Sequence, residues 1–149
     1  MCIRDSRYTT FLQDELVAVV HTGSKLSLPD EITPEDLSRI PLVLRERGSG
    51  TLDVFERALS EHNMKLSSLN VLLYLGSTES IKLFLEHTDC IGIVSIRSIS
   101  RELLSGTFRV IEIKGMPMLR EFCFAQPQGQ ESGLSQVLMQ FAMHHNKKL

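Results

Sequence analysis

The sequence predicts an α/β fold. Short apolar segments of strand length alternate with segments whose apolar residues recur at helical spacing. Glycine, proline and small polar residues separate the two kinds of segment along the whole chain. The chain has 149 residues, which is the length of one ordinary domain with a sizeable core. Because strands and helices alternate, crossover connections and a largely parallel sheet are expected.

Each element is predicted from its own pattern. Strands are expected where aliphatic residues run together, and helices where apolar residues recur every three or four positions. The predicted strands are residues 15–21, 41–45, 70–75, 91–95, 108–114 and 120–126. The predicted helices are residues 33–37, residues 51–59, a helix capped by Ser77, residues 98–105 and a last helix from Leu134.

Three of these helices have an apolar stripe that predicts which side faces the core. The inward residues are expected to be Val54, Phe55, Ala58 and Leu59 in the first, Ile81, Phe84 and Leu85 in the second, and Val137, Leu138 and Phe141 in the last. The helix over 98–105 is expected to stop at Gly106, because glycine readily takes the left-handed conformation that ends helices.

A glycine-flanked hydroxyl loop, Arg45-Glu46-Arg47-Gly48-Ser49-Gly50-Thr51, joins a predicted strand to a helix. Gly48 and Gly50 allow unusual backbone conformations and a close approach of a ligand. Ser49 and Thr51 place hydroxyls at a helix start, where free N–H groups and the helix dipole favour a small anion. An ordinary turn with a serine cap has the same spacing, so this loop alone leaves ligand binding open.

A second loop, Gly76-Ser77-Thr78-Glu79, opens the next helix directly after a strand. In open α/β sheets, ligands lie outside the carboxyl ends of the strands, and both loops are expected there. Ser77 and Thr78 are therefore candidates for ligand contact, although either of them is equally suited to capping the helix.

The first loop and the segment Tyr74-Leu-Gly-Ser-Thr-Glu-Ser-Ile-Lys82 resemble the effector-binding domain of LysR-type transcriptional regulators, and the resemblance covers residues 8–142. It implies an α/β domain of two lobes, like a type-2 periplasmic binding protein, with two strands crossing between the lobes. Residues 20–115 would form a complete second lobe, and residues 8–19 with 116–149 a partial first lobe. The family's effector-contacting role, carried onto this sequence, falls on Ser49, Gly50, Thr51, Ser77 and Thr78.

The resemblance also implies a function. The chain would be a regulatory domain that binds a small polar or anionic effector between its lobes, without catalysis and without a cofactor. DNA binding would belong to an N-terminal helix-turn-helix outside this sequence, and the full-length protein would be a cytoplasmic homodimer or homotetramer. A solute-binding protein of a transport system has the same fold and is the alternative, and an enzyme on this fold is a weaker one.

One segment departs from the family. His87-Thr88-Asp89-Cys90-Ile91-Gly92 stands where family members usually have Ala-Gly-Leu-Gly-Ile-Ala, so Thr88 and Cys90 replace both glycines. Asp89 is expected to supply the left-handed conformation that glycine usually gives. Cys90, at a strand start, is expected to be a small buried apolar side chain and not a redox sensor.

Composition and motifs argue against several other functions. A net charge of −2 and a pI near 6.2 give no sign of a nucleic-acid surface. The apolar runs are far shorter than a membrane span. Neither a nucleophile elbow nor a phosphate-binding loop for nucleotide hydrolysis occurs. The histidines do not cluster with acids at metal spacing, so no metal site is expected, and the three separated cysteines indicate reduced thiols.

The start of the chain, residues 1–7, is polar and lacks the apolar region of a secretory signal. Its opening, Met-Cys-Ile-Arg-Asp-Ser, resembles translated adapter sequence seen in metagenome assemblies. We therefore expect an artefactual or disordered segment at this end.

Overall fold

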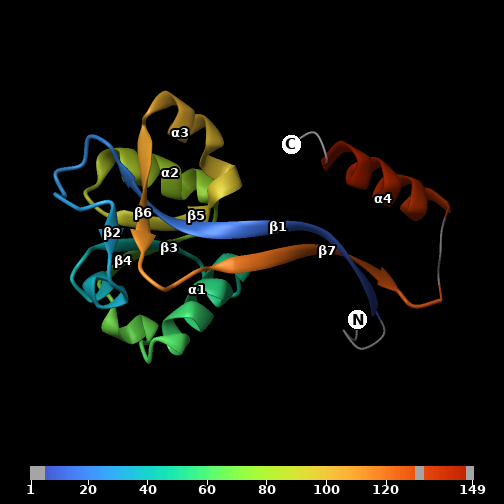
Figure 1. Ribbon diagram of the computed structural model, residues 1–149, viewed down its shortest axis with the longest axis horizontal. Helices are drawn as coiled ribbons and strands as arrows, with labels where there is room; N and C mark the ends of the chain where they lie inside the picture. The colour runs from blue at the N-terminus through green and yellow to red at the C-terminus, as the bar shows by residue number, and fades with distance from the viewer. Residues whose placement is uncertain (1–5, 130–132, 147–149) are drawn as a thin grey trace. The chain divides into compact units, whose positions relative to one another are not determined.

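The computed structural model describes residues 6–129 and 133–146 (Figure 1). The elements are β1 (Ser6–His21), β2 (Glu31–Ile32), the 3₁₀ helix η2 (Pro34–Ser38), β3 (Leu42–Arg45), α1 (Gly50–Glu61), η3 (Leu66–Ser68), β4 (Val71–Leu75), α2 (Thr78–His87), β5 (Ile91–Ser95), η4 (Ile96–Ile99), α3 (Ser100–Ser105), β6 (Phe108–Ile113), β7 (Leu119–Pro127) and α4 (Gly133–Asn146). All the predicted strands and helices are present. The short elements β2 and η3 were not predicted.

The described residues separate into two compact units. The larger unit consists of residues 15–120, and the smaller unit combines the described residues before position 15 with those after position 120. The predicted lobes, residues 20–115 and residues 8–19 with 116–149, stay a prediction.

The sheet has the strand order β2-β6-β1-β5-β3-β4, and β7 also pairs with β1. β3 is parallel to both β4 and β5, as crossover connections through α1 and α2 require. β1 is antiparallel to β5 and β6, with Val19 opposite Gly92 and Val110. The prediction of a largely parallel sheet is therefore wrong at its centre, because β1 enters between two strands that run the opposite way.

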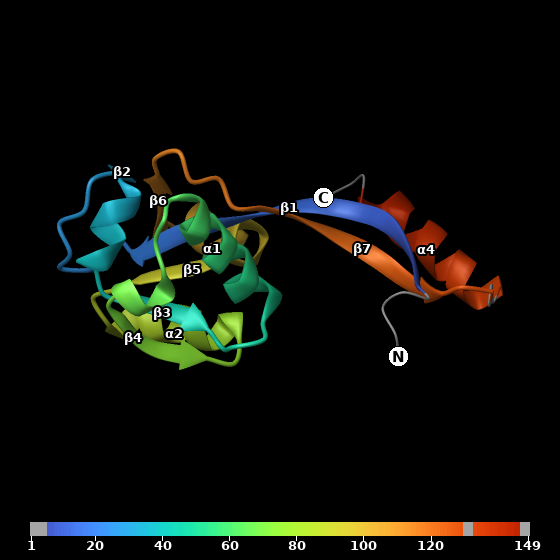
Figure 2. The ribbon, with the colours of Figure 1, turned by 90° about the horizontal axis from the view of Figure 1, so that it is seen from below.

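Helices cover both faces of this sheet in the larger unit. Figure 2 shows α1 on one face and α2 on the other. Phe55 and Leu59 of α1 are fully buried, as are Ile81 and Leu85 of α2 to within 1%. The predicted inner faces of these two helices are thus confirmed, with Phe84 packed more loosely at the edge of its cluster.

The predicted inner face of α4 is wrong. Val137 and Leu138 are each 62% exposed and Phe141 is 59% exposed, and none of the described α4 side chains is buried. The helix turns a different stripe toward its own unit, where the amide of Asn146 donates to the Phe11 carbonyl oxygen over 3.3 Å. The less exposed side consists of Ser135, Met139, Ala142, Met143 and Asn146. These positions also recur at helical spacing, so periodicity alone did not select between the two stripes.

The turn between α2 and β5 also differs from its prediction. The predicted left-handed conformation of Asp89 is wrong, since Asn63 is the one non-glycine residue with positive φ in the described part of the chain. Instead the Asp89 carboxylate accepts hydrogen bonds from the Lys25 backbone N–H (2.8 Å) and the Ser24 hydroxyl (2.9 Å). These bonds lower the pKa of Asp89, and they hold the turn without glycine.

Cys90 is fully buried, as predicted for a small apolar side chain. Burial, assisted by the charge of Asp89, raises the pKa of its thiol to about 11. A thiol with so high a pKa is almost entirely protonated near neutral pH, and its reactivity is correspondingly low.

The first five positions of the predicted disordered start lie outside the described residues, whereas Ser6 and Arg7 already belong to β1. No helix within residues 6–129 and 133–146 has the length and apolar character needed to cross a membrane.

Candidate functional site

Three helices of the larger unit begin at one edge of the sheet. β3, β4 and β5 run parallel, so their carboxyl ends lie at the same edge, and each is followed directly by a helix. α1 follows β3, α2 follows β4, and η4 follows β5. This edge, which we call the carboxyl edge, is where ligands bind in open α/β sheets.

A serine caps each of these helix starts. The hydroxyl oxygens of Ser49, Ser77 and Ser95 accept hydrogen bonds from the backbone N–H groups of Leu52 (3.2 Å), Ser80 (3.1 Å) and Arg97 (3.2 Å), respectively. Sequence reasoning selected the first two and missed Ser95. Its signal was similar, a serine that ends a predicted strand shortly before a predicted helix. The caps occupy only one free donor at each helix start, so the edge still carries polar backbone groups.

The two glycines of the loop between β3 and α1 differ in backbone conformation. Gly48 has φ of +89°, a conformation that other residues rarely adopt, so its prediction is confirmed. Gly50 is the first residue of α1 and has no such requirement. A Cβ atom at Gly50 would meet nothing within 4 Å, so its side of the helix start is open.

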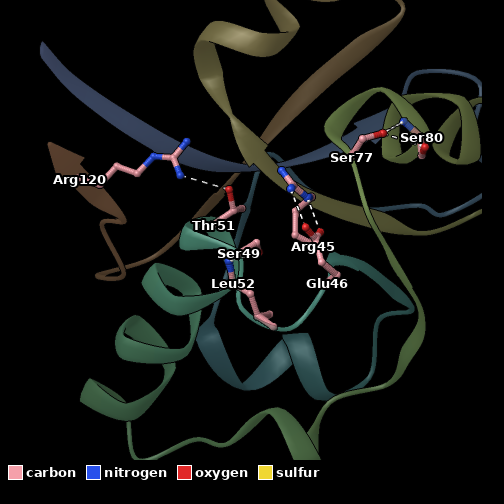
Figure 3. Close-up of polar contacts among 8 residues, drawn as sticks. All are labelled: Arg45, Glu46, Ser49, Thr51, Leu52, Ser77, Ser80 and Arg120. Carbon is pink, nitrogen blue, oxygen red and sulfur yellow. Dashed lines mark hydrogen bonds and ion pairs between the residues drawn. The ribbon is translucent and has the colours of Figure 1, made fainter. Parts of the chain in front are cut away.

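Ser49 and Thr51 lie on either side of Gly50 and are 9% and 8% exposed. The guanidinium Nη1 of Arg120, at the start of β7, donates to the Thr51 hydroxyl oxygen over 3.2 Å, as Figure 3 shows. Sequence reasoning did not select Arg120, because it is distant in sequence and carried no motif. Its position adds a positive group beside the first turn of α1, where the helix dipole is also positive.

Arg45 and Glu46 form a two-pronged ion pair at the end of β3, with N–O distances of 2.8 and 3.0 Å. The hydrogen bonds to Glu46 raise the pKa of Arg45, and those from Arg45 lower the pKa of Glu46. Both side chains therefore stay charged over a wide pH range, and each largely neutralises the other.

Ser77 and Thr78 lie at the start of α2 and are half-buried. The Ser77 hydroxyl also contacts the Ser80 hydroxyl at 2.8 Å. Since β4 is the neighbour of β3, the fold brings this loop to the same edge as Ser49, Gly50 and Thr51. Contact of these five residues with an effector stays a prediction.

A hollow of about 540 Å³ lies elsewhere in the larger unit. It is lined by β1, β6, the segment after β6 and Ile96 of η4, and by none of the five predicted residues. We take the carboxyl edge as the candidate site because polar groups converge there. Within the described residues, no group of three or more His, Cys, Asp or Glu is placed to hold a metal ion.

A mixed α/β sheet with ligand-type loops at one edge is the architecture of binding domains related to type-2 periplasmic binding proteins. The sequence profile described as "LysR substrate binding domain" matches residues 4–147, and the chain belongs to this family. The family resemblance and the fold class predicted from the sequence are thus confirmed.

The relatives with similar sequences include regulators of transcription. The chain is 29% identical over 138 residues to the HTH-type transcriptional activator CmpR of Synechocystis, covering 92% of this chain and 44% of CmpR. It is 29% identical over 120 residues to the RuBisCO operon transcriptional regulator of Acidithiobacillus ferrooxidans, covering 80% of this chain and 38% of that protein. The chain thus spans less than half the length of these relatives.

Solved structures show the same fold. The regulatory domain of Synechocystis CcmR, in complex with 2-PG, has a TM-score of 0.82 and 25% identity, with 97% of this chain and 69% of that chain covered. The effector-binding domain of QuiR in complex with shikimate has a TM-score of 0.78 and 20% identity, with coverage of 97% and 67%. The chain is therefore an effector-binding domain of the LysR type.

Proposed function

We propose that this chain senses a small polar or anionic effector at the carboxyl edge, as the regulatory domain of a DNA-binding transcriptional regulator. The observation that carries the proposal is the convergence of the serine-capped starts of α1 and α2 on one edge. Free backbone donors and aligned dipoles attract negatively charged or strongly polar groups. Arg120 beside Thr51 adds to the same preference.

The effector acts by shifting an equilibrium between conformations. It does so only to the extent that its affinities for the two forms differ. In this proposal residues 20–115 form one lobe, and residues 8–19 with 116–149 contribute to the other. The protein is not an enzyme and works in the cytoplasm as a homodimer or homotetramer. It contacts DNA through a helix-turn-helix outside this sequence, which is supported by relatives more than twice as long.

A solute-binding function is the second candidate. The likeness to a phosphate ABC transporter substrate-binding protein from Clostridium perfringens, with a TM-score of 0.68 and 16% identity, shows that the fold is shared. The similarity to CmpR and to the RuBisCO operon regulator favours the transcriptional regulator instead. Genomic sequence upstream separates the two, because a regulator has a winged helix-turn-helix there and a transport protein has an export signal.

The proposed site is tested by removing the hydroxyls of Ser49 and Thr51 in the complete regulatory domain. Calorimetry with 2-PG and other small anions should show affinity lowered by about tenfold or more for Ser49→Ala/Thr51→Ala, since each hydrogen bond contributes about 0.5–1.5 kcal/mol. Ser68→Ala is the control. Ser68 lies in η3, which precedes β4 and is therefore at the other end of that strand from the carboxyl edge, and its hydroxyl donates to the Lys65 carbonyl oxygen. Unchanged affinity in a folded double variant would remove both residues from the site.

A further inference from the structure

Lys82 makes a three-way contact inside the larger unit that the candidate site does not include. It lies in the second turn of α2, and its side chain is 13% exposed. The ammonium group reaches Glu102 Oε1 of α3 at 2.6 Å, the Ser98 carbonyl oxygen at 3.1 Å and Glu79 Oε1 at 3.1 Å. An ammonium has three N–H donors, so the three acceptors satisfy it completely.

The partners of Lys82 differ in exposure. The Glu102 side chain is 20% exposed, whereas Glu79 is 76% exposed. Burial opposes the charge of Lys82, but the hydrogen bonds to Glu102 and Glu79 outweigh it and raise the pKa of the lysine. The same bond from Lys82 lowers the pKa of Glu102. The Lys82–Glu102 pair is therefore the strong part of the contact, because little solvent screens it.

This contact connects two of the loops at the carboxyl edge. One turn before Lys82, Ser77 caps the start of α2. The Ser98 carbonyl that Lys82 binds belongs to η4, the helix capped by Ser95, and the Ser98 hydroxyl donates to the Ser95 carbonyl oxygen at 2.6 Å. A single ammonium thus links the segment after β4 with the segment after β5.

A half-buried ion pair of this kind adds little net stability, because removing both charges from much of their water costs about as much as their attraction returns. Its directional bonds instead fix one arrangement of the segments it joins. No donor in the described part of the chain reaches the second carboxylate oxygen of Glu102, Oε2, which is buried. Glu102 is therefore held mainly through its contact with Lys82.

We infer that Lys82 is a positioning residue of the carboxyl edge: held by Glu102, it fixes the η4 segment against α2 and so sets the spacing of Ser77 and Ser95. The inference rests on the proposed function in placing the effector at this edge. The link that Lys82 makes between α2 and η4 lies within the larger unit and is tested without a ligand.

The first test is hydrogen exchange on this chain with four variants. Lys82→Met keeps the stem and removes the donors, and Glu102→Gln removes the charge of the less exposed partner. Both should speed exchange in residues 77–81 and 95–99 by about tenfold or more, because breaking a half-buried pair leaves the remaining charge uncompensated. Lys82→Arg should restore protection, and Glu79→Gln, which removes the exposed partner, should change exchange by less than about twofold.

The comparison segment is β3, Leu42–Arg45, whose exchange should not change beyond the loss of global stability. Faster hydrogen exchange confined to residues 77–81 and 95–99 supports the link between α2 and η4 through Lys82. Equal acceleration throughout residues 15–120, or none in either segment, overturns it.

The second test measures 2-PG affinity of the same variants in the complete regulatory domain. Lys82→Met should weaken binding by about tenfold, and Lys82→Arg should recover it, since the contact orders the site in advance of binding. A loosened edge with unchanged affinity would overturn the positioning role. If the unaltered domain binds neither small anions nor small polar molecules, the proposed function fails, and the exchange experiment alone decides whether Lys82 links the two segments.

Discussion

The predicted apolar stripes of the helices are buried in one unit of this chain and exposed in the other. In residues 15–120, both helices with strong apolar stripes bury them, and Phe55 of α1 has no exposed surface. In the smaller unit, α4 has a stripe of the same kind, yet Leu134 is 81% exposed and Phe141 is 59% exposed. An apolar stripe therefore predicts the existence of a helix, whereas its burial depends on which other segments are present to cover it.

Exchange of backbone amides should separate the two units most strongly. Strand β3 lies between β4 and β5 in the sheet, and its first three side chains are buried. Its amide hydrogens should therefore exchange with solvent only when the larger unit unfolds. Amides of Leu42–Arg45 should exchange about a thousandfold or more slowly than those of α4, which has no buried residue. Equally strong protection of α4 in a monomeric sample would show that the helix has a partner not recognised here.

The sequence predicted the larger unit well because each of its segments carries its own signal. The hydroxyl, proline and acids of residues 33–36 produced η2, with the capping box between Thr33 and Asp36. The sheet centre was not predictable in this way. Whether β1 runs parallel or antiparallel to its neighbours depends on connections between distant segments, and local periodicity does not contain that information.

The candidate site divides in a similar manner. Ser49, Thr51 and Ser77 were selected because each lies where a predicted strand passes into a predicted helix. Ser95 lies in a similar place but was not selected. The contact of Arg120 with Thr51 could not be predicted from local sequence, because the two residues are 69 positions apart. The link from Lys82 to Glu102 is likewise a tertiary contact between two helices, and neither residue belongs to a local motif.

A matched pair of phenylalanine substitutions sharpens the comparison. Phe55→Ala should cost about 3–5 kcal/mol of unfolding free energy, because the ring is fully buried and leaves a cavity. Phe141→Ala should cost less than about 1 kcal/mol, since its ring is exposed and stacks mainly on His145, with ring centroids 4.0 Å apart. Denaturant unfolding followed by circular dichroism measures both. A cost for Phe141→Ala as large as that of Phe55→Ala would mean that α4 is buried in solution.

The two described cysteines, one in each unit, should differ in the reactivity of their thiols. Cys90 in the larger unit is buried, with a pKa of about 11, and Cys123 in the smaller unit is exposed. In a Cys2→Ser background at pH 8, a water-soluble thiol reagent should label Cys123 about a hundredfold faster than Cys90, because both access and thiolate fraction limit the buried thiol. Mass spectrometry of the labelled peptides measures the rates. Comparable rates would mean that β5 opens readily.

The smallest expected effect concerns the turn that replaces the family's glycines. Hydrogen bonds from the Lys25 backbone and the Ser24 hydroxyl lower the pKa of Asp89 in the folded chain. A lowered folded pKa contributes stability above the unfolded value, near 3.9, and that stability is lost as the pH falls through the folded pKa. Asp89→Asn keeps an acceptor oxygen but not the charge, so it should be slightly less stable than the unaltered chain at pH 7. The difference should disappear as the pH falls well below 3.9. Urea midpoints between pH 7 and pH 2.5 measure this, with Glu86→Gln as an exposed control. A difference that persists unchanged at the lowest pH would show that the carboxylate charge plays no part in holding the turn.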